Sequence, residues 1–590
     1  MSESASGVVP SQLKAPAGLV IAVLACAGAS VSMMYSLITP LLGSLVHILD
    51  VSIDDASWTI TATLLANAAA TPTLSRLSDM FGKRRLMMIS LSFMLVGSTL
   101  GALAPNLWVL ILARTLQGCS TAVIPIGISV MRDALPSHRL GPAVALMSAT
   151  MGLGGTIGIP VAGLLFGAFG WHAVFWVPAG IAALLLALIP LLLRETNVRT
   201  GGRFDYLGGL LFSAALLCLL LAITKGGTWG WTSTLIISLF TAFLALIAMW
   251  VPWELRNRMP LIDIRSTMHA PVLLTNISSI LLGFAFGGNT LGTLLMLTAP
   301  TSTGFGHGLT VTEAGLAMLP TAIVTVAIAP LAARSTGRLG ARATLIIGAA
   351  ITCFGYVQRI FFGTTVTEII ISAIIISVGM AVAYAAMPTL IMTSVPVTET
   401  SAANGLNSLL RGTGGAMSSA MFGALLAGIT ITVAGQVYPS FDAYQWGFVI
   451  SAAMAALGGI VGMWIHARPP SRLEALVPAL HGSTPVLDHS MRPEGRVHDV
   501  VRQGLVVTPD GAPVVNALVS LIGESGELLD WSRTETDGSF SIAMPAGGAY
   551  QVVVSEHDER PHRVMAEFAD EDRPARIVVP AAQDGIPVGE

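Results

Sequence analysis

Long apolar runs separated by short polar stretches dominate the chain up to about residue 466. Each run has about twenty apolar residues bounded by charges or turn residues, which is enough to cross a bilayer as a helix rising about 1.5 Å per residue. The pattern predicts fourteen such helices, at approximately 17–45, 56–76, 84–104, 107–128, 142–168, 172–194, 205–224, 232–252, 270–298, 313–335, 342–362, 368–390, 404–432 and 445–466. The first run lacks the short apolar core and cleavage site of a secretory signal, so it is expected to remain as the first helix.

One local pattern occurs twice, 258 positions apart, around the second and tenth predicted helices. The two copies are Asp55, Pro72, Arg76, Gly82 and Arg84, and Glu313, Pro330, Arg334, Gly340 and Arg342. The identical spacing indicates a duplicated architecture in which six helices in 17–194 match six in 270–466. Two further helices then lie in an insertion at 195–269, between the halves.

Composition and charge agree with a membrane protein, since 53% of residues are apolar and only 11% are charged. Alternate loops carry clusters of Lys and Arg, whereas the other loops hold only Lys225 and Arg359. By the positive-inside rule the basic loops, the amino terminus (1–16) and the carboxyl-terminal tail are expected in the cytoplasm. We therefore expect a multi-pass protein of the plasma membrane, of the bacterial inner-membrane type.

The four cysteines all fall in apolar segments, where they act as small hydrophobic residues. The sequence predicts no disulfide, no metal site, no cofactor and no nucleic-acid partner. No residues form a catalytic constellation, so an enzyme is not expected.

The tail changes character after residue 466, with a Pro- and Ser-containing linker at 467–493 followed by short alternating strands in 494–590. Strands are expected at 497–507, 514–522, 539–543, 550–555 and 576–579. His498, His557 and His562 are isolated and are expected at the surface. The run from Gly504 to Tyr550 resembles the carboxypeptidase regulatory-like, transthyretin-like β-sandwich. This acidic domain could bind a cytoplasmic protein partner or simply add mass below the membrane.

Four motifs in the helical region resemble the major facilitator family, over residues 17–466. Ser75 to Arg84 reads SRLSDMFGKR and is similar to the signature G-x-L-x-D-R-x-G-R-K, with Ser75 and Met80 departing from it. Arg114, Gln117 and Gly118 have the R-x-x-Q-G spacing. Gly154, Gly158, Pro160 and Gly163 are similar to the antiporter motif, and FDYLG at 204–208 resembles the fourteen-helix drug:proton antiporter branch. The resemblance implies an all-α polytopic membrane protein with the major facilitator fold and fourteen transmembrane helices (6+2+6), followed here by the small β-sandwich.

Physical roles can be assigned to the signature residues separately. Asp79 could accept hydrogen bonds from a helix amino terminus or an arginine and so latch the two halves when the cytoplasmic side is closed. Gly82 would let the loop turn. Lys83 and Arg84 belong to the same latch in this interpretation, but they could also only set topology.

Proton coupling is assigned to four residues, Arg114, Gln117, Asp55 and Glu313. An arginine inside a membrane helix costs about 2.5–3.5 kcal/mol on insertion scales, which favours a functional role for Arg114 over bonding to neighbouring carbonyls. Relatives usually carry an aspartate where Val31 stands, so Asp55, Glu313 and Asp79 are the carboxylates left for a proton. Helix capping is the alternative for Asp55 and Glu313.

The predicted cavity is apolar with scattered polar groups. Its candidates are Tyr35, Thr39, Asn67, Asn276, Asn289, Tyr384 and Arg411, although helix packing is the favoured role for any one of the polar residues and snorkelling to the surface is the favoured interpretation for Arg411. Because no acid lies inside a span, a neutral, anionic or lipid-like cargo is favoured over a cation. The antiporter glycines indicate either a rocking interface or ordinary close packing, and Pro160 is the candidate hinge.

The resemblance thus implies a secondary active, multidrug-type exporter of amphiphilic small molecules, working by proton-coupled antiport and alternating access. Two alternatives remain open: an exporter of a lipid or lipid-like metabolite, and a non-transporting receptor or scaffold that signals through the β-domain.

Overall fold

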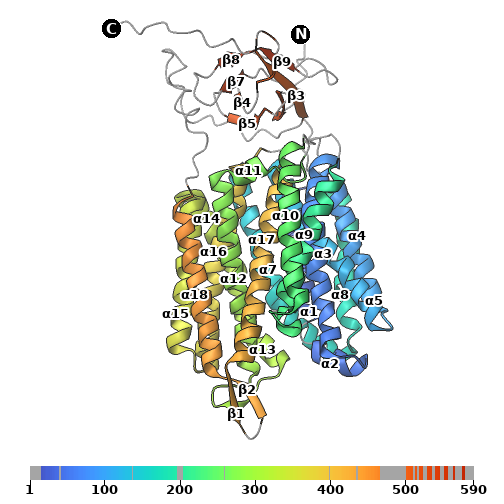
Figure 1. Ribbon diagram of the computed structural model, residues 1–590, viewed down its shortest axis with the longest axis vertical. Coiled ribbons are helices and arrows are strands. Elements are labelled where there is room, and N and C mark those ends of the chain that lie inside the picture. Colours follow the sequence, from blue (N-terminus) through green and yellow to red (C-terminus); the bar gives the residue numbers. More distant parts are fainter. Residues whose placement is uncertain are drawn as a thin grey trace.

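The protein forms a long helical bundle with a small β-domain at one end (Figure 1). This computed structural model describes residues 15–38, 41–135, 137–195, 204–257, 260–396, 399–433, 436–465, 500–508, 510, 512–514, 517–522, 528–534, 538–544, 551–555, 562–564 and 575–578. The predicted linker at 467–493, most of the amino-terminal segment, His498 and His557 lie outside the described residues.

The amino-terminal half runs from α1 to α8. Its elements are α1 (Ala17–Leu37), α2 (Leu42–Ile48), α3 (Ile53–Phe81), α4 (Lys83–Ala102), α5 (Leu107–Cys119), η2 (Ser120–Ala122), α6 (Val123–Ala134), α7 (Ser137–Phe169) and α8 (Ala173–Leu192). The predicted helix at 17–45 is wrong in detail, because α1 ends at Leu37 and a separate short helix, α2, follows. The predicted helix at 56–76 is too short, since α3 continues to Phe81.

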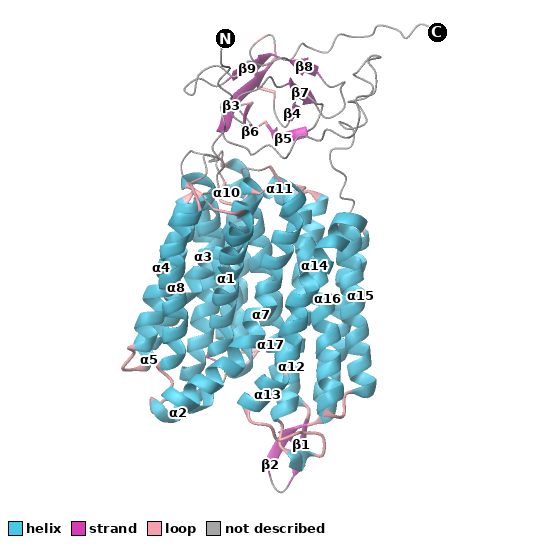
Figure 2. Cartoon of the chain, turned by 180° about the vertical axis from the view of Figure 1, so that it is seen from behind, coloured by secondary structure: helices cyan, strands magenta, loops and turns pink. Residues whose placement is uncertain are grey.

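The inserted pair and the carboxyl-terminal half follow. They comprise α9 (Tyr206–Trp229), α10 (Thr234–Arg256), α11 (Ile264–Met268), α12 (Ala270–Thr298), η3 (Thr301–Thr303), α13 (Val311–Ala317), α14 (Leu319–Leu339), α15 (Ala341–Phe362), α16 (Val366–Met392), α17 (Thr400–Gly428), the hairpin β1 (Thr430–Val433) and β2 (Gln436–Pro439), and α18 (Phe441–Met463). The hairpin lies in part of the range predicted as helix at 404–432, so that prediction is wrong at its end. The hairpin and the β-domain lie at opposite ends of the bundle (Figure 2).

Eleven helical segments in the described part of the chain are both long and apolar enough to cross a membrane. Three more long helices, α3, α7 and α17, have 29, 33 and 29 residues and pack within the same bundle. Their higher content of small and polar residues suits helices that face other helices rather than lipid.

The sequence repeat reappears as two matching helix joints. Gly82 separates α3 from α4 with φ 113°, and Gly340 separates α14 from α15 with φ 84°. L side chains rarely adopt such angles, which explains glycine in both copies. Pro72 and Pro330 stand inside the helices that precede the joints.

The two halves meet along two seams. In one seam α7 packs against α13, α14 and α16, and in the other α3 packs against α17. The inserted helix α9 contacts both α3 and α17, whereas α10 packs mainly on α9 and is the least buried of the membrane-length segments. The insertion therefore covers one seam from outside.

The β-domain holds two small sheets. β6 (Ser539–Met544), β3 (Val500–Val507) and β9 (Ala575–Val578) form one, with β3 antiparallel to β6 and parallel to β9. β5 (Leu528–Arg533), β4 (Leu518–Ile522), β7 (Gln551–Ser555) and β8 (His562–Val564) form the other, which is antiparallel throughout. Val506, Val519, Phe540, Val552 and Ile577 belong to one buried cluster, so the sheets share an apolar core. The sequence pattern did not indicate β5 or β8.

Candidate functional site

The carboxylate of Asp79 joins the two halves at the β-domain end of the bundle. It lies in the last turn of α3, not in a loop as expected, and it is buried. Its oxygens accept hydrogen bonds from the backbone N–H groups of Ser401 at 3.4 Å and Ala402 at 2.9 Å. These N–H groups belong to the first turn of α17, whose own N-cap residue makes no side-chain capping bond. Asp79 therefore caps, from the other half, a helix that does not cap itself.

Arg132 reinforces this contact between the halves. From the last turn of α6 it donates to the hydroxyl of Thr400 and to the carbonyl oxygens of Val395 at 3.4 Å and Pro396 at 3.5 Å. The sequence interpretation treated Arg132 only as part of a basic loop. A guanidinium that binds carbonyls of the connection between α16 and α17 and the hydroxyl at the start of α17 holds this corner of the second half in place.

The remaining residues of the signature lie around the α3–α4 joint. The Glu195 carboxylate accepts from the backbone N–H groups of Arg84 at 3.1 Å and Arg85 at 3.0 Å, which caps α4. A Cβ atom at Gly82 would lie 2.6 Å from Glu195 Oε1, so this cap as well as the positive φ requires glycine. The capping role of Glu195 was not foreseen.

Lys83 forms a buried ion pair with Asp133 of α6. The distance from Lys83 Nζ to Asp133 Oδ2 is 2.5 Å, and both side chains are fully buried. Asp133 Oδ1 has no hydrogen-bond partner. Charges buried in this way are held strongly to one another, so the pair fixes α4 against α6 within the amino-terminal half.

A second carboxylate, Glu399, lies beside the Asp79 contact at the N-cap of α17. Burial, reinforced by the nearby Asp263 and Asp79 and opposed by Arg76, raises the pKa of Glu399 to about 8. Arg76, Asp263 and Glu399 line a small cavity of about 20 Å³, which is enough for one water molecule. Glu399 is thus a half-buried carboxyl group at the seam, and sequence reasoning missed it because it lies between two predicted helices.

Near the middle of the bundle, Arg114 is bonded mainly to helix carbonyls. It donates to the carbonyl of Met34 at 3.0 Å, the carbonyl of Thr59 at 3.1 Å and Gln117 Oε1 at 2.7 Å. Gln117 in turn donates to Ser98 at 2.9 Å. The side chain is 1% exposed and its Nη2 has no partner. Arg114 therefore ties α1, α3 and α5 together and still has an unused donor.

Arg411 lies near the middle of α17 and does not snorkel. It is 3% exposed, and its guanidinium stacks on the Tyr384 ring with 4.7 Å between Cζ and the ring centroid. Among the described residues, its nitrogens make one hydrogen bond, from Nη2 to Ser408 at 3.2 Å, while Nε and Nη1 have no partner there. Of the predicted cavity residues, Tyr384 and Arg411 are the pair that the structure brings into contact.

The predicted asparagines are occupied with helix packing. Asn289 donates to Ala373 and Ser377, and Asn276 accepts from Asn407. The oxygen of Asn67 accepts from the hydroxyls of Thr71 and Thr121. Tyr35 follows Met34 on α1 and is half-buried, and Thr39 lies outside the described residues.

At the hairpin end, Asp55 and Glu313 lie in the first turns of α3 and α13 and bond to the N-cap residues of those helices. Asp55 is exposed, its N–H donates to Ser52, and its carboxylate accepts from the same hydroxyl at 2.6 Å. Glu313 forms a capping box with Thr310 at the start of α13. Both residues therefore fit the alternative role left open by the sequence, in which an acid stabilises the amino terminus of its own helix.

Residues of the antiporter motif on α7 pack against two different helices, α1 and α13. A Cβ atom at Gly154 or Gly158 would collide with α1, so these glycines permit close packing within the amino-terminal half. A Cβ atom at Gly163 would instead lie 2.3 Å from Thr312 Oγ1, and one at Gly315 would lie 3.1 Å from Pro160 Cδ. Pro160 and Gly163 therefore touch α13 of the other half, so the halves are in contact at both ends of the bundle.

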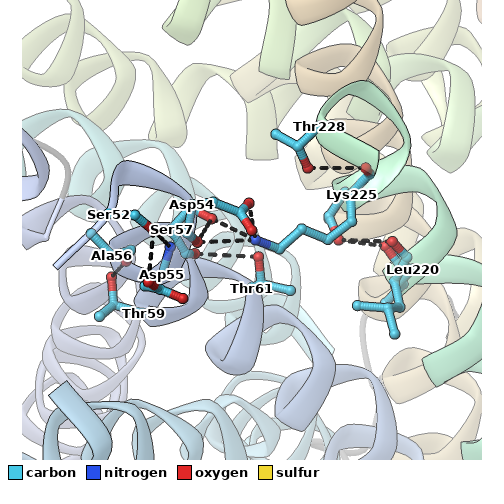
Figure 3. Close-up of polar contacts among 12 residues, drawn as sticks. Ser52, Asp54, Asp55, Ala56, Ser57, Thr59, Thr61, Leu220, Lys225 and Thr228 are labelled. Carbon is cyan, nitrogen blue, oxygen red and sulfur yellow. Dashed lines mark hydrogen bonds and ion pairs between the residues drawn. The ribbon is translucent and has the colours of Figure 1, made fainter. Parts of the chain in front are cut away.

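Lys225 fixes the inserted helix α9 to α3 at the hairpin end (Figure 3). Its Nζ donates to Asp54 Oδ1 at 2.7 Å and to the Ser57 hydroxyl at 2.8 Å, and it lies 4.8 Å from the Trp58 ring centroid. Lys225 was expected in an outer loop, but it is 1% exposed within α9. The Gly-Gly pair after Lys225 favours the end of a helix, so the sequence carried no signal that α9 continues to Trp229.

An open groove of about 650 Å³ runs along α3 between α5 and α9. Its lining is mostly apolar and includes Trp58, Leu65, Ala69, Ile111 and Leu217. The small residues of α3 leave this space beside the seam that α9 covers.

Comparison with known proteins adds family relationships to this geometry. The model of the Major Facilitator Superfamily matches residues 24–419 and, in a second match, 280–553. Multidrug resistance protein Stp of Mycobacterium tuberculosis is 29% identical over 381 residues, covering 63% of this chain and 69% of that protein. The tetracenomycin C resistance and export protein of Streptomyces glaucescens is 26% identical over 398 residues, covering 66% and 72%. The crystal structure of the human organic anion transporter MFSD10 (TETRAN) aligns with a TM-score of 0.54 over 76% of this chain and all of that one, at 13% identity, which concerns the fold alone.

Proposed function

Because the chain belongs to the Major Facilitator Superfamily, we propose that it is a multidrug-type exporter of amphiphilic small molecules, driven by exchange for protons. Relatives named for multidrug resistance and for drug export support this class of cargo. The observation that carries the proposal is the pair of contacts between the halves, Asp79 with α17 at one end and Gly163 with α13 at the other.

These contacts suit alternating access. Parting α3 from α17 would open the β-domain end while the α7–α13 contact stays closed, and parting α7 from α13 would do the reverse. In this cycle Asp79 is the latch between the halves, and Gly82 and Arg84 form the capped joint that positions it. Lys83 holds α4 on α6 beside this joint, and Pro160 acts as the hinge in α7. The cargo would lie between the halves, near Arg114, Tyr384 and Arg411.

Proton exchange needs groups that bind protons in one state and release them in the other. Asp79 and Glu399 at the β-domain end are our leading candidates, since both carboxylates lie at the seam that must part. Asp55 and Glu313 at the hairpin end are further from such a role, because their carboxylates cap their own helices.

The topology we infer has fourteen spans, made of the eleven apolar segments together with α3, α7 and α17. By the positive-inside rule, the basic residues at the β-domain end support a cytoplasmic location for that end and for both termini. The two sheets with a shared core support a transthyretin-like β-sandwich for the tail. A cytoplasmic protein is the partner we infer for it, and the plasma membrane is the expected location.

A lipid or lipid-like metabolite is the second candidate cargo. The apolar groove beside α3 favours it, because a lipid-like molecule could leave or enter the bundle sideways along such a surface.

Site-directed variants test the proposed function in membrane vesicles. Asp79→Asn and Arg114→Ala should each slow export of an amphiphilic dye while the protein remains in the membrane at wild-type levels. Asp442→Asn, which changes an exposed acid in the first turn of α18, is the control and should export normally. Export at the wild-type rate by both test variants would contradict the proposed mechanism.

A further inference from the structure

Three arginines among the described residues are buried in the bundle: Arg114, Arg359 and Arg411. They differ in how many of their nitrogens donate a hydrogen bond. Arg359 is 2% exposed, and its three nitrogens donate to Ser372 at 2.8 Å, Thr293 at 2.7 Å and the carbonyl of Ile369 at 2.8 Å. Arg359 therefore has the bonding expected of a structural cation. Arg411 is equally buried, yet two of its three nitrogens have no partner and the third makes one long bond.

The charge of Arg411 is also uncompensated. Among the described residues the ion pairs are Lys83 with Asp133 and Lys225 with Asp54, and neither involves Arg411. A buried cation with unused donors is costly unless something negative pairs with it. A bound cation would add to this cost, whereas a bound anion would remove it.

The side chains around Arg411 indicate which chemical groups a bound anion would carry besides its charge. The guanidinium lies on the face of Tyr384, whose ring lies 5.9 Å from that of Phe286 on α12. Gly412, the residue after Arg411 on α17, faces Asn67 of α3. A Cβ atom added to Gly412 would lie 3.9 Å from Asn67 Nδ2. Arg411 thus lies beside the seam between the halves. The rings of Tyr384 and Phe286 lie near its guanidinium, which has no anionic partner among the described residues.

From these observations we infer that Arg411 is the anion-binding group of the transport site, and that the cargo is an amphiphile with one negative head and an aromatic or apolar body. The inference rests on the proposed exporter function and names the charge of its cargo. The head accepts hydrogen bonds from Arg411 Nε and Nη1, and the body lies along Tyr384 and Phe286. Arg114 lies in the amino-terminal half and its Nη2 has no partner among the described residues. Its charge adds to the positive electrostatic potential at the anion site.

The test uses three probes with one aromatic body and different charges: naphthalenesulfonate, naphthalenesulfonamide and naphthylmethyl-trimethylammonium. Equilibrium binding of each radiolabelled probe is measured on the purified full chain in lipid nanodiscs. We expect the wild type to bind the sulfonate at least about ten times more tightly than the other two probes. Arg411→Gln should weaken sulfonate binding about ten- to hundredfold, the loss expected when a hydrogen-bonded charge partner is removed, without weakening sulfonamide binding. Arg411→Lys should restore part of it.

Arg359→Gln is the matched control, because it removes an equally buried arginine that has no unused nitrogen. It should lower thermal stability but keep the order of the three probes. Sulfonate binding that is absent, that is no tighter than binding of the cationic probe, or that survives Arg411→Gln would overturn the inference.

Vesicle transport separates this inference from the proposed function. If the sulfonate binds through Arg411 but no probe moves across the membrane with the protein, the anion site stands and the exporter function fails. If the cationic probe is transported best, the exporter function stands and the anion site fails.

Discussion

Replacing Asp79 by Asn should loosen the β-domain end of the bundle. The carboxylate accepts hydrogen bonds from two backbone N–H groups of α17, at 2.9 and 3.4 Å. Only the 2.9 Å distance lies in the usual range for such a bond. A hydrogen bond to a charged group contributes about 1.5–3 kcal/mol, against about 0.5–1.5 kcal/mol for a neutral pair. Asn keeps a neutral acceptor, so the closed arrangement should lose about 1–2 kcal/mol, which is a five- to thirtyfold change in the closed-to-open ratio.

The opening can be measured with a cysteine at position 75. Ser75 is fully buried on α3, and a Cβ atom at Gly405 of α17 would lie 2.6 Å from its hydroxyl oxygen. In the purified protein in lipid nanodiscs, with the four native cysteines replaced by Ala, Ser75→Cys should react with a water-soluble maleimide only when α3 and α17 part. The labelling rate then reports the open fraction.

With Asp79→Asn the labelling rate at this cysteine should rise about five- to thirtyfold. Asp442→Asn, at the hairpin end, is the matched control and should leave the rate unchanged. An unchanged rate in Asp79→Asn, or an equal rise in both variants, would refute the capping of α17 by Asp79.

Three further predictions concern the other charged groups. Lys83→Met leaves Asp133 buried without its partner and should destabilise the protein by about 3–5 kcal/mol, whereas adding Asp133→Leu should recover most of the loss in thermal unfolding; equal stability of the single and double variants would contradict this. The carboxyl group of Glu399 has a pKa of about 8 in the closed arrangement against 4.5 ordinarily, so closing takes up a proton and is favoured at low pH. Labelling of the same cysteine reporter is divided at each pH by the labelling rate of that cysteine in the unfolded protein, because maleimide reacts with the thiolate and its intrinsic rate rises with pH. This ratio should rise as the pH increases from about 6 to 9, and Glu399→Gln should flatten it; an unaltered ratio would rule out Glu399. Lys225→Met should destabilise less than Lys83→Met, because its partner Asp54 is 41% exposed and can be hydrated; the reverse order would contradict the role of burial.

The helical architecture follows from local properties of the sequence, which explains why it could be predicted. Apolar runs must form helices in a bilayer because every backbone N–H and C=O needs a partner there. The repeat located equivalent joints, and Gly82 and Gly340 do share a backbone conformation that favours glycine. Boundaries were less accurate, since polar residues such as Asp79 continue a helix when they are satisfied by another helix.

The contacts between distant segments could not be predicted in the same way. Asp133, Glu195 and Glu399 lie in or beside polar loops, where a charged residue is normally solvated and gives no distinctive pattern. Their roles depend on which helix end lies opposite, and that is decided by tertiary packing. Arg411 illustrates the same limit, because its distance from the predicted helix start suggested snorkelling whereas the packing of α12 and α16 encloses it.

Coupled transport by the purified full chain is the most direct test of its function. The protein is reconstituted in vesicles that contain a pH-sensitive dye, a proton gradient is imposed, and anionic, neutral and cationic amphiphiles are added in turn. Our account predicts proton movement that depends on the amphiphile, is strongest for the anionic compounds and is slowed by Asp79→Asn. Folded, oriented protein that moves neither protons nor any of the compounds would contradict the exporter and favour a receptor or scaffold.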